Sequence, residues 1–174
     1  ADLSGIELRV NMFLWQVPYA MALFRADPEK ADLYKALASE VMGVPIEGMP
    51  KMVRQAGKAM HLGCGFGLGS QDKYIAVAKT MAQIVVTPEE AAEHIAGYRR
   101  KHPEIVQGWK TCHSALDAIA VGAEQPIDPW EMCWTCAEGI RTPRGMIRYP
   151  NLRKERNEEG KAEWFYGEGR HKAR

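Results

Sequence analysis

Four residues set four apart along one segment have the side chains needed to hold a nucleoside triphosphate. They are Arg54, Lys58, Leu62 and Phe66. On an α-helix each step of four residues turns by about 400°, so the four side chains form one slanting stripe about 18 Å long. Two cations at one end can hold phosphate oxygens, and the other end offers an apolar surface for a sugar and a base. Taken alone, this pattern also fits a helix with a solvated cationic face and two apolar residues in the core.

A second segment, at the start of the chain, places a carboxylate directly before a predicted helix. Asp2 is followed by Ser4 and Glu7, which have the spacing of a capping box, and an apolar periodic run comes behind them. The pattern predicts that a strand ends near Asp2 and that a helix begins near Ser4. Together with the cationic stripe, this carboxylate suits a site for a magnesium-bound triphosphate.

The elements that must position these residues are mainly helices. Pro18 interrupts the first helix, and start and stop signals predict further helices over 31–42, 50–63, 73–84, 87–101 and 103–121. After Gly122, prolines and glycines break up the chain, and the segment 139–149 is predicted to form a β-hairpin with a Pro-Arg-Gly turn. The fold class is therefore mainly α with a small β component (α+β).

The composition is that of an ordinary globular chain. The 174 residues are the size of one domain, the formal net charge is +1, and no apolar run approaches the roughly 20 residues that a membrane span needs. Four cysteines without a secretory signal indicate a reducing, cytoplasmic compartment, bacterial or phage-infected. The chain opens without a methionine, and we expect it to be a piece of a longer one.

Charge is unevenly distributed. The stretch from Arg141 to the end holds ten Lys/Arg against five Glu, a net charge of +5, so the rest of the chain carries −4. This basic end suits either contact with nucleic acid or a solvated tail.

Both segments resemble motifs of the family A DNA polymerases. The stretch Asp2-Leu-Ser-Gly-Ile-Glu-Leu-Arg resembles the first palm motif, Asp-Tyr-Ser-Gln-Ile-Glu-Leu-Arg. The stretch 54–67 resembles the fingers-helix motif, Arg-x3-Lys-x3-(Phe/Tyr)-Gly-x2-Tyr-Gly. Thr87-Pro-Glu-Glu and the helix pair behind it resemble the phage members. The likeness covers roughly residues 1–120 well and the rest loosely.

This resemblance implies the fingers and a partial palm of a right-hand polymerase. The start of the palm would cover 1–30, the fingers 31–122 with the nucleotide-binding helix at 50–64, and 123–174 would be an irregular segment whose β-hairpin returns toward the palm. The parent enzyme would add dNTPs to a primer 3′ end on a DNA template during replication. We expect a monomeric polymerase whose partners are primer–template DNA and dNTPs, with no membrane.

The resemblance also implies a role for each matching residue. Asp2 would be one of two palm carboxylates that bind two Mg²⁺ ions, with the backbone carbonyl of Leu3 as a further ligand. Glu7 would exclude a ribose 2′-hydroxyl. On the fingers helix, Arg54 and Lys58 would hold the triphosphate, and Lys58 would also serve as a proton donor to pyrophosphate.

The remaining matches would contact the sugar, the base and the phosphates. Leu62 would lie beside the sugar and base, Gly63 would let the nascent pair approach closely, and Phe66 would stack near the templating base. Tyr34 falls where many relatives place a histidine against the phosphates. Arg9 is interpreted as a structural cation.

Three departures from the family pattern have consequences. Leu62 replaces an aromatic residue and Gly5 replaces a glutamine, so stacking and a DNA contact would be lost. The second palm carboxylate of the family lies in a His-Asp-Glu sequence, and no His in this chain is followed by Asp. We therefore expect this piece, taken alone, to be catalytically inactive.

A non-catalytic nucleic-acid-binding module derived from a polymerase is the alternative interpretation. Cys133 and Cys136, with Cys112 and His113 about twenty residues earlier, have spacing that zinc could use, although ordinary buried thiols are the simpler explanation. The other histidines show no partner constellation and are interpreted as surface or capping residues: His61, His94, His102 and His171.

Overall fold

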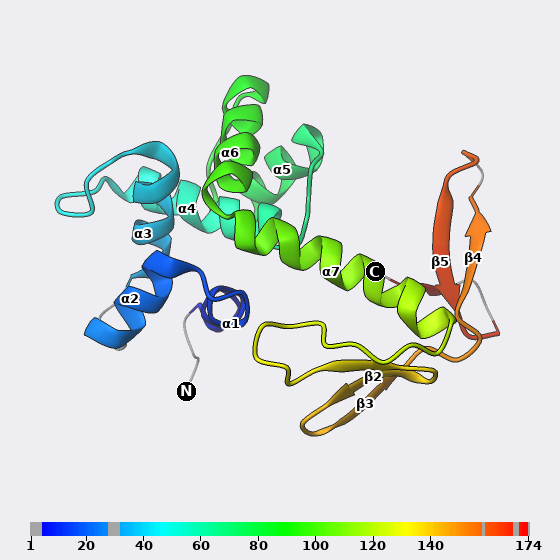
Figure 1. The fold of residues 1–174 in the computed structure, drawn as a ribbon. Helices are drawn as coiled ribbons and strands as arrows, with labels where there is room; N and C mark the ends of the chain where they lie inside the picture. The colour runs from blue at the N-terminus through cyan, green and yellow to red at the C-terminus, as the bar shows by residue number, and fades with distance from the viewer. Residues whose placement is uncertain (1–4, 28–31, 158, 169–170, 174) are drawn as a thin grey trace. The chain divides into compact units, whose positions relative to one another are not determined.

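The computed structural model describes residues 5–27, 32–157, 159–168 and 171–173. It divides into two compact units, which meet in sequence between Gln107 and Gly108. Over the described residues the chain forms seven α-helices, one π-helical turn and six short strands (Figure 1). The predicted class, mainly α with a small β component, is confirmed. Within these ranges no helix combines the length and the apolar composition that a bilayer span requires.

The first unit is helical, and its helices gather around α4 (Lys51–Cys64). Helices α3 (Leu33–Met42), α5 (Gln71–Val77) and α6 (Pro88–Lys101) all pack against α4 (Figure 1). The sequence signals explain where two of them begin. Asp32 caps α3 by accepting a hydrogen bond from the backbone N–H of Lys35 at 3.1 Å, and Thr87 and Glu90 form a complete capping box at α6.

The remaining helices of the first unit are α1 (Ile6–Leu14), α2 (Pro18–Ala26) and the start of α7 (Pro103–Ala120). Helix α1 begins at Ile6, and its N-cap is Gly5 with φ +68°. Ser4 and the predicted strand end at Asp2 lie outside the described residues.

The helix predicted over 73–84 is two elements. Helix α5 is followed by a π-helical turn, η1 (Ala78–Ala82), and Gln83 ends it in the left-handed region with φ +58°. Ala78 and Ala82 are buried, so the extra residue of the π-turn keeps the apolar face toward the core.

A close approach of two helices brings α3 against the cationic helix. A Cβ atom at Gly57 of α4 would lie 2.2 Å from the carbonyl oxygen of Tyr34 in α3. No side chain larger than hydrogen fits at that distance, so glycine here lets the α3 backbone lie directly on α4. The contact places Tyr34 and Asp32 beside the first turn of α4.

The second unit contains two antiparallel sheets of three strands and the rest of α7. The first sheet has the order β1 (Trp134–Cys136), β2 (Gly139–Thr142) and β3 (Gly145–Arg148), and the second has β4 (Arg153–Arg156), β5 (Ala162–Tyr166) and β6 (His171–Lys172). The predicted hairpin is confirmed, because Thr142 pairs with Gly145 across a Pro-Arg turn. Its neighbours are not irregular, since four further strands flank it.

The core of this unit is small. Leu116 and Ile119 of α7 pack with Trp164 of β5, and four partly buried residues complete the cluster: Ile140, Tyr149, Leu152 and Ala173. The second sheet was not predicted because its strands are short, and charged residues alternate with the apolar ones over only a few positions.

Four histidines were interpreted as surface or capping residues, and two of them, His61 and His102, have no exposed area. His102 is the C-cap of α6, which confirms the capping interpretation there, whereas His61 lies inside α4 and is neither at the surface nor a cap. Nδ1 of His102 donates to the carbonyl oxygen of Tyr98 at 2.8 Å, so its Nε2 accepts from the Tyr19 hydroxyl at 3.1 Å. These two hydrogen bonds make the polar ring of His102 acceptable in the core.

Candidate nucleotide-binding site

The stripe predicted on the cationic helix is formed by α4 and the turn that follows it. Arg54, Lys58 and Leu62 lie on the helix and are half-buried. The helix ends at Cys64, so Phe66 lies in the turn, and 65% of its surface is exposed. Most of the Phe66 ring is therefore in contact with solvent.

Arg54 is held in place by two residues of the neighbouring helix. Its Nε donates to Oδ2 of Asp32 at 2.7 Å, and its guanidinium carbon lies 5.3 Å from the centre of the Tyr34 ring. Burial by itself would raise the pKa of Asp32, but the hydrogen bonds from Arg54 and from the Lys35 backbone outweigh it and lower that pKa. The carboxylate is therefore ionised at neutral pH, and the pair is charged.

Tyr34 is the point at which the two sequence motifs meet. A Cβ atom at Gly5, the N-cap of α1, would lie 3.6 Å from the Tyr34 hydroxyl oxygen. Burial raises the pKa of Tyr34, and the carboxylates of Glu7 and Asp32 add to the rise while Arg54 opposes it. The phenol is therefore a neutral hydrogen-bond donor, between the start of α1 and the cationic end of α4.

A cavity joins α1 to the far end of the stripe. It has a volume of about 390 Å³. Its wall is formed by Phe66 and by five residues of α1, namely Ile6, Glu7, Val10, Asn11 and Leu14. Nδ2 of Asn11 donates to the carbonyl oxygen of Gly65 at 3.2 Å and fixes one side of it. Glu7 and Phe66, predicted from separate motifs, thus share one apolar cavity with a single carboxylate.

His61 belongs to this site, and sequence reasoning missed it. Its ring lies 5.8 Å from that of Phe66 and 6.4 Å from that of Tyr34, measured between centroids. Neither ring nitrogen has a hydrogen-bond partner among the described residues, and burial lowers the pKa of His61 to about 4. The helical period offered a signal, because His61 lies one turn from Gly57 and from Cys64, both buried.

Gly63 is required by packing against α5. A Cβ atom at Gly63 would lie 2.9 Å from Cδ2 of Tyr74, a fully buried ring whose hydroxyl pairs with Nδ1 of His94 at 3.0 Å. A side chain at position 63 would therefore point toward Tyr74. Its predicted approach to a nascent base pair stays a prediction.

We expect Gly63→Ala to destabilise the first unit by about 1–3 kcal/mol, the usual cost of one extra methyl group in a packed core. The Tyr74 ring cannot move aside without breaking its hydrogen bond to His94. Denaturant unfolding measures the effect. Ala76→Gly, at an exposed position of α5, is the control for a change of one methyl group; equal and small losses for both variants would contradict the packing role.

The predicted metal ligands are outside the part that the structure describes. Asp2 and Leu3 are among the residues not described. Within the described ranges no group of three or more His, Cys, Asp or Glu residues lies close enough to hold a metal ion. The Mg²⁺ assignment to Asp2 and Leu3 therefore stays a prediction.

The cysteine segment has no features of a thiolate site among the described residues. The Asp128 carboxylate accepts the backbone N–H groups of Trp130, Met132 and Cys133 at 2.9, 3.3 and 2.7 Å. Burial, with Asp128 beside it, raises the pKa of Cys133. The zinc interpretation of this segment stays a prediction.

The basic end carries cations that are largely neutralised. Among the described Lys/Arg from Arg141 onward, six form ion pairs, and the carboxylates that pair with three of these lie earlier in the second unit. Those pairs join Arg141 to Glu124, Arg148 to Glu138 and Lys154 to Asp117. Both interpretations of the basic end, contact with nucleic acid and a solvated tail, stay predictions.

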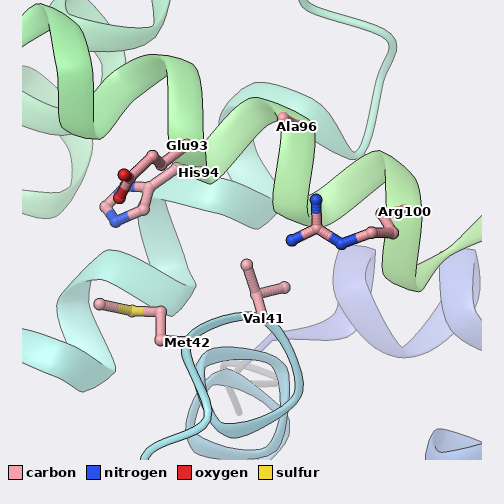
Figure 2. A pocket seen from close by; sticks show the side chains of 6 residues that line it. All are labelled: Val41, Met42, Glu93, His94, Ala96 and Arg100. Atoms are coloured by element: carbon pink, nitrogen blue, oxygen red, sulfur yellow. The ribbon is translucent and has the colours of Figure 1, made fainter.

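A second cavity, of about 430 Å³, contains none of the predicted site residues. Figure 2 shows Glu93, His94 and Arg100 of α6 around it, with Val41 and Met42 at the end of α3 forming the opposite wall. It brings together no phosphate-binding pair and no exposed aromatic ring, and it lies apart from the two motifs in sequence. The candidate site is therefore the one between α1, α3 and α4.

An Arg and a Lys on one helix, the Glu7 carboxylate on α1 and an exposed aromatic ring together form the candidate site. Comparisons with known proteins identify the family of the chain. The family described as "DNA polymerase family A" matches residues 1–118, and the chain belongs to this family.

Curated relatives extend the same result. The chain is 34% identical over 105 residues to DNA polymerase I of Rhizobium leguminosarum, which covers 60% of this chain and 9% of that protein. It is 30% identical over 106 residues to a DNA polymerase of Bacillus phage SP01, covering 60% of this chain and 11% of the relative. The chain thus spans about a tenth of the length of these relatives.

Proposed function

We propose that this chain is the start of the palm and the fingers of a longer, phage-type DNA polymerase that adds dNTPs to a primer 3′ end. One observation carries the proposal: the Tyr34 ring lies 5.3 Å from the guanidinium carbon of Arg54, and its hydroxyl oxygen would lie 3.6 Å from a Cβ atom placed on Gly5, the N-cap of α1. The two motifs, about fifty residues apart in sequence, therefore border one site. We assign 1–30 to the palm, 31–122 to the fingers and 123–174 to the return toward the palm.

Each assigned residue has a role that its position supports. Arg54 and Lys58, one helical turn apart, hold phosphate oxygens, and Tyr34 donates a hydrogen bond beside them. Glu7 and Phe66 line one cavity, where the carboxylate excludes a 2′-hydroxyl and the ring stacks near the templating base. Leu62 and Gly63 lie between these two ends, and Lys58 is also the proton donor to pyrophosphate.

Asp2 and the carbonyl of Leu3 would hold Mg²⁺ with a second carboxylate from elsewhere in the polymerase. When bound, the metal pair activates the primer hydroxyl and stabilises the leaving pyrophosphate. The chain's own side chains bind and orient the triphosphate. Because the second carboxylate motif is not in this sequence, we propose that the 174 residues alone do not extend a primer.

Replacing Lys58 with alanine tests the proposal. We expect the KM for dNTPs to rise, or the chemical step to slow, by roughly 10- to 100-fold, the scale of a lost charged hydrogen bond. Steady-state and single-turnover primer extension by the complete polymerase measure the change. Lys51→Ala, at an exposed position in the first turn of the same helix, is the control and should extend primers normally. Unchanged kinetics for Lys58→Ala would remove it from the triphosphate site.

A further inference from the structure

Arg54 is constrained on one edge and one face. Nε donates to Asp32 at 2.7 Å, and the flat guanidinium lies over the Tyr34 ring at 5.3 Å. Within the described part of the chain, these contacts use the Nε edge and one face of the group. The two terminal nitrogens form the opposite edge, the one that can hold two phosphate oxygens side by side.

We propose that Asp32 is a positioning residue for the triphosphate: its carboxylate holds Nε of Arg54 and keeps the terminal nitrogens presented to phosphate. This inference rests on the proposed function and deepens it. A free arginine side chain loses rotamer freedom when it binds, and prior ordering lowers that loss. Asp32 does not touch the nucleotide. It acts through Arg54.

Two features of Asp32 make it suited to this task. As the N-cap of α3 it accepts the backbone N–H of Lys35, so the carboxylate is itself fixed by the helix that carries Tyr34. Each of the two carboxylate oxygens has its own partner, Oδ1 with Lys35 and Oδ2 with Arg54. An asparagine could keep the first contact, but its NH₂ group cannot accept from Arg54.

The test is therefore Asp32→Asn in the complete polymerase. Asparagine caps helices as well as aspartate does, so α3 is expected to persist. We expect the KM for dNTPs to rise roughly three- to tenfold, as for the loss of one part-exposed charged hydrogen bond, with kcat and the Kd for primer–template DNA unchanged. Ser70→Ala, which removes the N-cap of α5 instead, is the matched control and should leave KM unchanged.

A double-mutant cycle with Arg54→Ala separates positioning from structural damage. If Asp32 acts through Arg54, Asp32→Asn adds no further rise in KM to the Arg54→Ala variant. Additive effects, a lower KM for Asp32→Asn, or a parallel loss of DNA binding would each overturn the proposal. If Arg54→Ala alone leaves KM unchanged, the proposed function fails instead. Should Asp32→Asn fail to fold, Asp32→Ser, which also caps, enters the same cycle.

Discussion

Primer extension by the complete polymerase is expected to fall roughly 10³-fold when Asp2 is replaced by asparagine, a loss of the size seen when one stabilising group is removed from a transition state. The amide keeps the shape of the side chain but lacks the negative charge that a Mg²⁺ ligand provides. Binding of primer–template DNA should persist, because that affinity comes mainly from protein Lys and Arg side chains that contact the DNA phosphates. Single-turnover extension and fluorescence anisotropy measure the two quantities separately.

The matched control for this variant is Asp72→Asn. Asp72 is exposed in the first turn of α5, so its replacement makes the same chemical change away from the candidate site. We expect that control to extend primers at nearly the normal rate. If Asp2→Asn does so too, Asp2 is not a metal ligand and the palm assignment of the N-terminal motif is lost.

The second large effect is a loss of stability in acid through His61. Burial lowers the pKa of His61 to about 4, against an ordinary value of about 6.5. Below pH 6.5 the unfolded chain therefore binds a proton that the folded chain does not accept until about pH 4. The free energy of unfolding should fall by about 2 kcal/mol between pH 7 and pH 5, and by about 3 kcal/mol near pH 4.

His61→Leu isolates this contribution. Leucine removes the titrating group together with two buried nitrogens that have no partner among the described residues, so the variant should lose less stability in acid than the parent. Urea unfolding at pH 7 and pH 5 gives both values. Leu62→Ala, at the next residue of α4, removes apolar contacts only and should cost the same at both pH values. Parallel pH profiles for His61→Leu and the parent would contradict the assignment.

The predicted and observed helices agree where local chemistry decides the matter. Thr87 with Glu90 closes a capping box, Asp32 caps α3, and prolines at 18, 88 and 103 begin helices in the structure. Such signals act within one turn, so a sequence carries them completely. Helix α1, predicted to begin near Ser4, begins at Ile6 after Gly5, which takes the left-handed conformation.

The site was predictable as a set of residue types, but its internal contacts were not. Arg54 was predicted to bind phosphate from its spacing to Lys58, yet nothing in that spacing shows that Asp32 holds it. His61 was interpreted as a surface or capping residue because it has no partner at a metal-ligand or catalytic interval. The Asp32–Arg54 contact and the burial of His61 both depend on helices that are distant in sequence.

Sequence alone determined the family, the order of the helices and the residue types at the phosphate and base ends of the site, because motif chemistry and capping are local. Tertiary structure decided which of those residues meet. Gly57 lets α3 lie directly on α4, and only that close contact puts Asp32 and Tyr34 against Arg54 and brings Tyr34 to the N-cap of α1. Burial lowers the pKa of His61, and packing against Tyr74 requires a glycine at position 63. Both effects depend on more than one helix, so they cannot be read from a single segment.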